Sequence, residues 1–354
     1  MTDAAGRPSD DVPVVVRPAR EADGPAWDAF NFAAPHGSFF HRFAWRSLLR
    51  DTFGLVPCHL IAERAGSIVG LLPLFHQKNL LFGKALISSP FCVEGGPLAA
   101  DARAAEALDK AAVALMDELD VPVLEYRSRK ASRAGWAAKR DLYATFARPL
   151  SASDDENLKA IPRKQRAVVR KALSGTLTAA QEDGVDALYR AYSESVRNLG
   201  TPVFAKRWFA RLRIAFGEGC EVVVIRNGGK PVSAVMSFYH GDTVLPYYGG
   251  GTAAARSSGA NDLMYWQVMC RAARRGCRRF DFGRSKADTG AFAFKRNWGF
   301  EPQWLEYEYR LAPGAQLPEK NPNNPKYALL IAAWKKLPLP VANLVGPFLI
   351  RGLG

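Results

Sequence analysis

Two stretches of the chain share one pattern of apolar and polar positions. Residues 59–75 (HLIAERAGSIVGLLPLF) and 221–238 (EVVVIRNGGKPVSAVMSF) each hold two apolar runs around a short turn that contains glycine. Aligned on Phe75 and Phe238, the turns fall at the same place. Apolar, β-rich runs on both sides of such a turn predict a β-hairpin. The sequence therefore predicts two hairpins of the same design.

The elements around the two hairpins also follow one order. Each hairpin is followed by a strand-like run, a glycine-rich loop, a helix and a further strand that ends in LEYRS or FDFGRS. Each is preceded by a strand and two helices. The predicted helices are 22–32, 43–52 and 102–119 in the first half, and 185–198, 205–216 and 261–275 in the second. This agreement indicates an internal duplication of one α/β unit, with mixed, mostly antiparallel sheets flanked by helices.

Composition and charge add limits on the class of protein. The chain has 354 residues, 48% of them hydrophobic, which is enough for two domains with separate cores. A net charge of +14 and a pI near 9.7 favour partners that carry phosphate or carboxylate, such as tRNA, a nucleotide cofactor or an anionic membrane. A basic protein without such a partner is the alternative.

Targeting, redox and metal signals point to a cytoplasmic protein. Five scattered cysteines without a CxxC pair fit a reducing compartment, and the five histidines have no metal-ligand spacing, so we expect no metal. The polar N-terminus does not resemble a secretory signal. The longest nearly uncharged apolar run, residues 337–350, is short and contains three prolines, which disfavours a membrane span.

A basic segment joins the two halves. Ser153 or Asp154 can cap a helix here, and Pro162 suits a first turn or a kink. Beyond it, Arg163 and Arg166 recur at helical spacing on one face, and no acidic residue lies between positions 157 and 180. The segment is either a solvated basic face or an anchor for a phosphate-bearing acceptor between the lobes.

A glycine-rich loop before the last predicted helix is a candidate phosphate site. Arg256, Gly259 and Asn261 stand directly before or at the start of that helix. The N-terminus of a helix offers unpaired N–H groups and a positive dipole end, and glycine lets the backbone approach a ligand. A simple capped turn is the alternative interpretation.

The run GCRRFDFGRS, followed by GAFAFKRNWGFEP, resembles the FemAB-like and BioF2-like branch of the GNAT acyltransferase superfamily. Together with GLLPLF, SSPF and EGGPLA, it is most similar to a subgroup associated with exosortase (PEP-CTERM) exopolysaccharide loci. The resemblance covers nearly the whole chain and implies a tandem GNAT fold. GNAT enzymes hold the diphosphate of acyl-CoA with an (Arg/Gln)xxGx(Gly/Ala) loop, and here Asn261 departs from that pattern.

The resemblance implies transfer of an acyl or aminoacyl group to an amine. The leading interpretation is an N-acyltransferase that uses acyl-CoA, or a similar thioester, and an envelope or exopolysaccharide-related amine acceptor. Classical Fem enzymes instead take amino acids from aminoacyl-tRNA and add them to a cell-wall precursor, which is the second interpretation. A non-catalytic scaffold of an exopolysaccharide locus is the third.

Acyl transfer to an amine requires proton removal, stabilisation of an oxyanion and alignment of both substrates. Asp281, at the end of a predicted strand, can accept the proton or cap the turn before Gly283. The family position of Lys295 implies that it stabilises the oxyanion or a donor phosphate. Further substrate-binding candidates are Arg284, Ser285 and Tyr248.

The predicted divisions are a disordered N-terminus (1–12), an N-terminal GNAT-like lobe (13–150), a basic connecting helix (151–175), a C-terminal catalytic lobe (176–312) and a tail (313–354). The first lobe has no RxxGxG-like loop and is predicted to bind the acceptor or to be structural. The tail combines an apolar surface with Trp334, Lys335 and Lys336, so it either packs on the body or makes a peripheral contact with the inner membrane, where a lipid-linked acceptor would be met.

Overall fold

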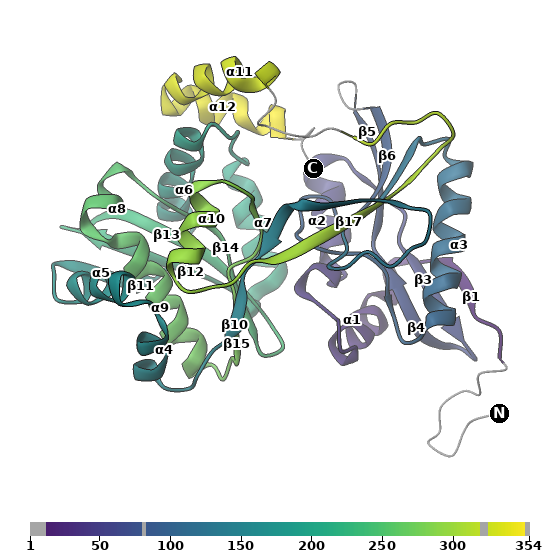
Figure 1. Cartoon of the computed structure of the whole chain (residues 1–354), viewed down its shortest axis with the longest axis horizontal. Helices are drawn as coiled ribbons and strands as arrows, with labels where there is room; N and C mark the ends of the chain where they lie inside the picture. Colours follow the sequence, from purple (N-terminus) through teal and green to yellow (C-terminus); the bar gives the residue numbers. More distant parts are fainter. Residues whose placement is uncertain (1–11, 80–82, 319–324, 351–354) are drawn as a thin grey trace. The chain divides into compact units, whose positions relative to one another are not determined.

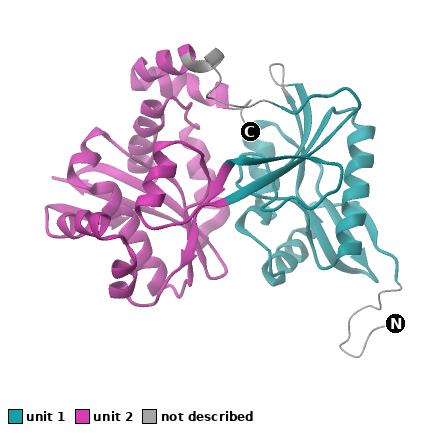
Figure 2. Ribbon diagram, viewed as in Figure 1, with its two compact units in different colours: residues 1–142, 304–318 teal, residues 143–303, 319–354 magenta. Residues whose placement is uncertain are grey.

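The computed structural model describes residues 12–79, 83–318 and 325–350 (Figure 1). The predicted disordered N-terminus lies, except for its last residue, outside the described residues. The chain forms two compact units (Figure 2). Unit 1 consists of residues 1–142 with 304–318, and unit 2 of residues 143–303 with 319–354. Both are mixed α/β units with mostly antiparallel sheets, which confirms the predicted fold class.

Unit 1 contains two sheets and three α-helices among its described residues. One sheet has the strand order β1-β3-β4-β7, and the strands β17-β8-β6-β5-β2 are neighbours in the other. The elements are β1 (Val15–Pro18), α1 (Gly24–Ala33), α2 (Ala44–Phe53), β2 (Val56–Pro57), β3 (Leu60–Arg64), β4 (Ser67–Leu72), β5 (Leu74–Asn79), β6 (Gly83–Ser88), β7 (Leu98–Ala99), α3 (Ala102–Glu118), β8 (Val123–Tyr126), and most of β9 (Ala137–Thr145) and β17 (Gln303–Leu311).

Unit 2 is built on a six-stranded sheet with the order β10-β15-β14-β13-β12-β11. Its elements are β10 (Ala147–Pro149), α4 (Asp154–Ala160), α5 (Arg163–Leu173), β11 (Leu177–Gln181), α6 (Asp186–Leu199), α7 (Lys206–Phe216), β12 (Cys220–Asn227), β13 (Lys230–His240), β14 (Thr243–Gly251), α8 (Ala253–Ser258), α9 (Ala260–Arg274), β15 (Arg279–Asp281), β16 (Ser285–Lys286), α10 (Gly290–Asn297), α11 (Pro325–Lys336) and α12 (Leu339–Ile350).

Both predicted hairpins are present. Strands β3 and β4 are antiparallel neighbours, as are β12 and β13. The two turn residues have positive φ in each case: Ala65 (50°) and Gly66 (78°) in the first, Gly228 (54°) and Gly229 (77°) in the second. Positive φ at both central positions gives the turn a twist that matches the flanking strands, and this explains the glycines in both turns.

The closing strand of each half pairs in the other unit. Strand β17 pairs with β8, and β10 pairs with β15, both antiparallel. The sequence placed all of 13–150 in the first lobe and all of 176–312 in the second. The difference arises because a strand joins the sheet whose edge offers hydrogen bonds, and that pairing is not local in sequence.

The connecting segment is two helices rather than one. The Ser153 side chain accepts a hydrogen bond from the Glu156 N–H and caps α4, as the sequence predicted. Pro162 then stands at the N-cap of α5. Helix α5 packs against α9, and its buried Val169 and Ala172 join the main core of unit 2. The segment therefore belongs to unit 2.

Candidate functional site

Strands β14 and β15 of unit 2 run parallel and then separate. They pair only at Thr243 with Arg279 and at Val244 with Phe280. Beyond that point β14 continues to Gly251 along β13, while Asp281 pairs with Ala147 of β10. We call the place where the two strands separate the unit 2 fork. Asp281, Gly283 and Lys295 are joined by hydrogen bonds just beyond it.

Lys295 of α10 is the main buried cation at the unit 2 fork. Its side chain is 8% exposed, and Nζ donates to the carbonyl oxygens of Gly283 (2.8 Å) and Arg284 (3.2 Å). The rings of Phe146 and Phe282 lie 5.4 and 6.0 Å from Nζ. Burial lowers the pKa of Lys295 to about 7, although the nearby Asp281 carboxylate acts in the opposite direction. Lys295 therefore changes protonation state near neutral pH.

Asp281 holds the turn that follows β15. Its Oδ1 accepts hydrogen bonds from Thr145 Oγ1 (2.9 Å) and from the Gly283 N–H (2.8 Å), and the side chain is buried. Gly283 has a φ of 67°, which a side chain disfavours. Of the two roles expected for Asp281, these contacts support the turn cap, and through the turn Asp281 sets the position of the Gly283 carbonyl that holds Lys295.

Ser285 and Arg284 follow this turn. The Ser285 hydroxyl is buried and has no hydrogen-bond partner among the described residues. Leaving a buried hydroxyl without a hydrogen bond costs free energy. The Arg284 guanidinium lies over the Tyr143 ring at 4.6 Å. Ser285 thus offers a donor and acceptor that the protein itself leaves unused.

The tyrosines around β14 have different environments. Tyr248, a predicted substrate contact, is buried in an aromatic cluster, where its hydroxyl accepts a hydrogen bond from Trp208 Nε1 (3.2 Å). Tyr247 instead faces Gly283, where an added Cβ would lie 3.9 Å from its ring. Tyr265 of α9, which the sequence analysis did not single out, packs on Phe282 at 4.8 Å between ring centroids. Its i+4 spacing from Asn261 was the signal that could have placed it on this face of the helix.

The glycines at the end of β14 permit close packing. A Cβ on Gly250 would lie 2.7 Å from Ser195 Cβ of α6, and one on Gly251 would lie 2.4 Å from Asn261 Oδ1. Both distances are shorter than real Cβ contacts. The close approach of α6 and α9 to the sheet therefore requires these glycines. A bound ligand is not the sole explanation for them.

Carboxylates occupy both helix N-termini at the predicted phosphate loop. The Ala253 N–H, at the start of α8, donates to Glu194 Oε1 of α6 (2.8 Å). Asp262, in the first turn of α9, is buried and accepts hydrogen bonds from Trp298 Nε1 (2.9 Å) and from the Gln165 amide of α5. The Glu194 carboxylate takes an N–H group that a phosphate would require, and negative charge on either carboxylate repels a second anion.

The three predicted cofactor residues lie close together but have separate roles. Arg256 is exposed on α8 and has no side-chain partner among the described residues. Gly259 links α8 to α9 with a φ of 71°, and a Cβ there would lie 3.1 Å from Val168 of α5. Asn261 Oδ1 accepts a hydrogen bond from Ser233 Oγ of β13 (2.7 Å). Gly259 and Asn261 thus have packing and hydrogen-bonding partners within unit 2, and an anion-binding role for all three remains a prediction.

The predicted basic anchor lies on α5. Arg163 is exposed, whereas Arg166 is half-buried and its Nε donates to the carbonyl of Ile161 at the end of α4 (3.2 Å). Arg163 is therefore the more available of the two for an external phosphate.

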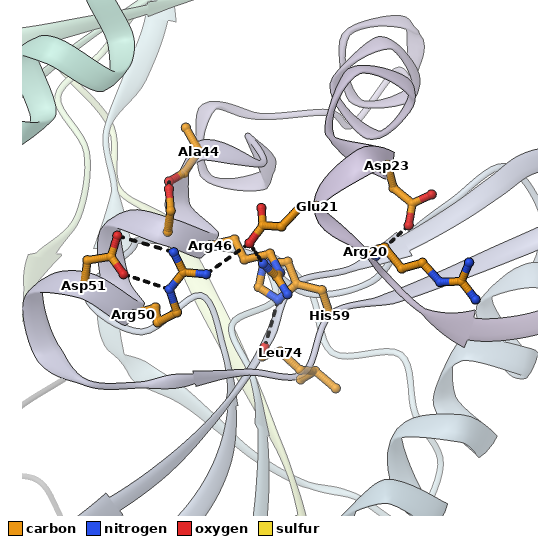
Figure 3. A network of polar contacts seen from close by, with 10 residues as sticks. Arg20, Glu21, Asp23, Ala44, Arg46, Arg50, Asp51, His59 and Leu74 are labelled. Carbon is orange, nitrogen blue, oxygen red and sulfur yellow. Dashed lines mark hydrogen bonds and ion pairs between the residues drawn. The ribbon is translucent and has the colours of Figure 1, made fainter.

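Several polar groups in unit 1 are bound to one another. Figure 3 shows Glu21 in ion pairs with Arg46 and Arg50, the second of which also pairs with Asp51. His59 Nδ1 is hydrogen-bonded to the Leu74 carbonyl (2.9 Å), and burial lowers its pKa to about 3. His41 likewise uses both ring nitrogens, on Ser38 and on the Gly96 carbonyl. These side chains stabilise unit 1 and do not form an acid–base pair.

Within the described ranges, no group of His, Cys, Asp and Glu has the arrangement of a metal site. None of the helices in the described part of the chain is both long and apolar enough to traverse a bilayer.

Comparison with known proteins gives the class. Residues 157–296 match the family model described as "Acetyltransferase (GNAT) domain". None of the curated protein sequences matches significantly. This part of the chain is a GNAT domain, and the predicted acyltransferase of the GNAT superfamily is confirmed.

Solved structures share the fold over both units. FemX aligns with a TM-score of 0.65 at 15% identity and covers 83% of this chain and 96% of its own. A tandem GNAT protein from the clavulanic acid biosynthesis pathway aligns at 0.55 and 11% identity (86% and 100% covered). L-PGS from Bacillus licheniformis aligns at 0.52 and 12% identity (93% and 98% covered). At these identities the likeness concerns the fold, and it agrees with a tandem GNAT architecture.

Proposed function

We propose that this chain transfers an acyl group to an amine at the unit 2 fork, with Lys295 as the central group. The observation that carries the proposal is the buried Lys295, whose pKa is about 7 and whose Nζ is held by two backbone carbonyls. Perturbed ionisable groups of this kind are typical of reacting centres.

The chemistry requires a group that handles charge and protons. The amine nitrogen attacks the acyl carbonyl, an oxyanion forms, and the bond to the leaving oxygen or sulfur breaks as the amine proton is transferred to that atom. A lysine ammonium has three N–H donors, two of which Lys295 gives to the Gly283 and Arg284 carbonyls. The third can stabilise the oxyanion. Because the pKa of Lys295 is near 7, the same group can also transfer a proton at neutral pH.

For the donor, we favour an aminoacyl ester on tRNA over acyl-CoA. The sequence led to acyl-CoA through the loop of Arg256, Gly259 and Asn261. Glu194 and Asp262 at the adjacent helix N-termini oppose a diphosphate at that place. The net charge of +14 supports binding of tRNA, whose phosphates need no such loop. Acyl-CoA is retained as the rival donor.

For the acceptor, we propose a small or lipid-linked amine related to the cell envelope or an exopolysaccharide. The exposed Arg163 on α5 is the proposed contact for a phosphate of that acceptor. The buried Ser285 hydroxyl, which has no partner among the described residues, is a second contact for substrate.

A direct comparison of donors tests the proposal. The full chain is mixed with bulk aminoacylated tRNA or with acetyl-CoA, each with lysine amide as the amine, and loss of ester or thioester is followed. We expect amide formation from charged tRNA that Lys295→Met abolishes and that high salt suppresses. Turnover of acetyl-CoA that Arg256→Ala abolishes would instead establish the rival donor, and no transfer from either donor would contradict the proposed reaction.

A further inference from the structure

Helices α11 and α12 form a hairpin that contacts α6 of unit 2. Only a narrow row of residues on α12 is buried. The buried residues of α12 are Ala342, Gly346 and Ile350, which recur every fourth position and so share one face. A Cβ on Gly346 would lie 2.9 Å from the Val203 backbone nitrogen, so this helix lies directly against the segment after α6. In Figure 1 the hairpin, in yellow, lies beside the end of α6.

Polar contacts fix the hairpin in this position. Arg197 Nη1 donates to the carbonyl oxygens of Lys335 (3.3 Å) and Leu337 (3.2 Å), where α11 ends. Trp334 Nε1 donates to the Thr201 carbonyl (3.2 Å). Of the two alternatives predicted for the tail, packing on the body therefore occurs, but it uses only the inner face of the hairpin.

Several large apolar side chains of both helices are exposed. Leu329 and Leu330 of α11 are 82% and 67% exposed, and Leu344 and Phe348 of α12 are 71% and 68% exposed. We call this set the apolar face, which also includes Val341, Val345 and Leu349. Single exposed apolar residues are ordinary, but a group on two adjacent helices marks an interaction surface.

The charges around the apolar face indicate what covers it. Residues 325–350 contain three lysines and no acidic residue. Lys335 and Lys336 are exposed at the end of α11, next to the half-buried Trp334. Apolar side chains bordered by lysine and tryptophan are the pattern of a segment that lies in the interface of an anionic membrane. A second copy of the chain would place lysines opposite lysines, because a twofold interface brings identical surfaces together.

We propose that the apolar face of α11 and α12 docks on an anionic lipid surface. Each helix has 12 residues and is about 18 Å long, so neither crosses the roughly 30 Å apolar core, and both would lie along the surface. The lysines interact with lipid headgroups, and Leu344 and Phe348 insert among the acyl chains. This membrane contact is independent of the reaction proposed above.

Vesicle co-sedimentation of the full chain tests the proposal. We expect binding to phosphatidylcholine vesicles that contain 30% phosphatidylglycerol, and much weaker binding to pure phosphatidylcholine. The double variant Leu344→Asp with Phe348→Asp should lose at least tenfold in partitioning. Ile214→Asp is the matched control, because Ile214 of α7 is also 82% exposed but lies outside the hairpin, and it should bind as the wild type does.

A second variant keeps the test valid if the aspartates disturb folding. Lys335→Gln with Lys336→Gln removes only exposed charge and should weaken binding to the anionic vesicles by about fivefold per lysine. No binding to either vesicle, or equal loss in the Ile214 control, would overturn the proposal. A wild-type dimer that the Leu344 and Phe348 variant converts to a monomer, without vesicle binding, would overturn it in favour of an interface between copies.

Discussion

The two units contain the same fork, but their polar side chains have different partners. In unit 1 the parallel pair is β6 with β8, at Leu86–Leu124 and Ile87–Glu125, and in unit 2 it is β14 with β15. Arg127 and Ser128 follow β8, just as Arg284 and Ser285 follow β15. An Arg-Ser dipeptide thus follows the second parallel strand in each unit, directly after β8 in unit 1 and after two further residues in unit 2.

In unit 1 this dipeptide is fully bonded. Arg127 Nε pairs with Glu125 Oε1 at 3.0 Å, its Nη1 donates to the carbonyl oxygen of Cys92 at 3.1 Å, and both charged groups are buried. Ser128 Oγ donates to Glu308 Oε2 at 3.0 Å. In unit 1 these polar groups are therefore all bonded to groups of the same unit.

In unit 2 the serine of this dipeptide has no such partner in the part of the chain that the structure describes. Ser285 Oγ has no hydrogen-bond partner among the described residues, and Lys295, whose pKa is about 7, donates to the carbonyl oxygen of the adjacent Arg284. The serine hydroxyl after the parallel pair is thus bonded in unit 1 and, within the described ranges, left without a hydrogen bond in unit 2. The difference explains why we assign the chemistry to unit 2.

The largest effect is expected for Lys295→Met. Removing a group that stabilises a developing oxyanion lowers the rate by about 10³-fold. The measurement is kcat/KM for acyl transfer, with Arg127→Met as the matched removal of a buried cation in the other fork. Equal losses of kcat/KM per folded molecule in the two variants would contradict the assignment of the chemistry to unit 2.

Arg127→Met should act on stability instead. It leaves the buried Glu125 carboxylate without its ion-pair partner, which costs about 3 kcal/mol. Chemical denaturation measures this as a lower free energy of unfolding. A double variant that also carries Glu125→Gln should recover part of the loss, and a single variant as stable as the wild type would contradict the role given to this pair.

Ser285→Ala and Ser128→Ala test the two serines separately. Loss of the Ser128 hydrogen bond should reduce the free energy of unfolding by about 1 kcal/mol, with unchanged kinetics. Loss of the Ser285 hydroxyl should not reduce stability, because it has no partner among the described residues, but should raise KM by about tenfold. Steady-state kinetics and denaturation on both variants measure the two effects. An unchanged KM for Ser285→Ala would show that Ser285 does not contact the substrate.

The smallest effect is expected for Arg256→Ala. Because carboxylates occupy the neighbouring helix N-termini, we expect the variant to change binding of acetyl-CoA by less than about twofold. Isothermal titration measures the affinity. A loss of tenfold or more would place the acyl-CoA diphosphate at this loop and reverse our preference for the donor.

Local features of the fold were predictable from the sequence. The hairpin turns at Gly66 and Gly229 and the helices α3 and α9 follow from glycine positions and apolar periodicity, which depend on neighbours in the chain. The exchange of β10 and β17 was not predicted, because pairing between distant strands leaves no local pattern.

Part of the site was predictable for the same reason. Lys295 and Ser285 stand in a recognisable run, and both lie at the unit 2 fork. The glycine-rich loop appeared suited to phosphate, but Glu194 and Asp262 reach it from α6 and from a buried turn of α9, and only the folded chain shows them there. Tyr265 was missed because an aromatic residue in an apolar helix has the same sequence signature whether it lines a site or fills a core.

The pH dependence of the free energy of unfolding reports on the buried Lys295 without any substrate. The pKa of Lys295 is lowered from 10.5 in the unfolded chain to about 7 in the folded one. Between these values the unfolded state binds more protons, so the wild type gains stability as pH rises. Relative to Lys295→Met, the wild type should be least stable below pH 7, and the gap should close by about pH 10. Arg127→Met should show no such trend, since arginine stays charged throughout. A constant gap between wild type and Lys295→Met from pH 6 to 10 would contradict the account.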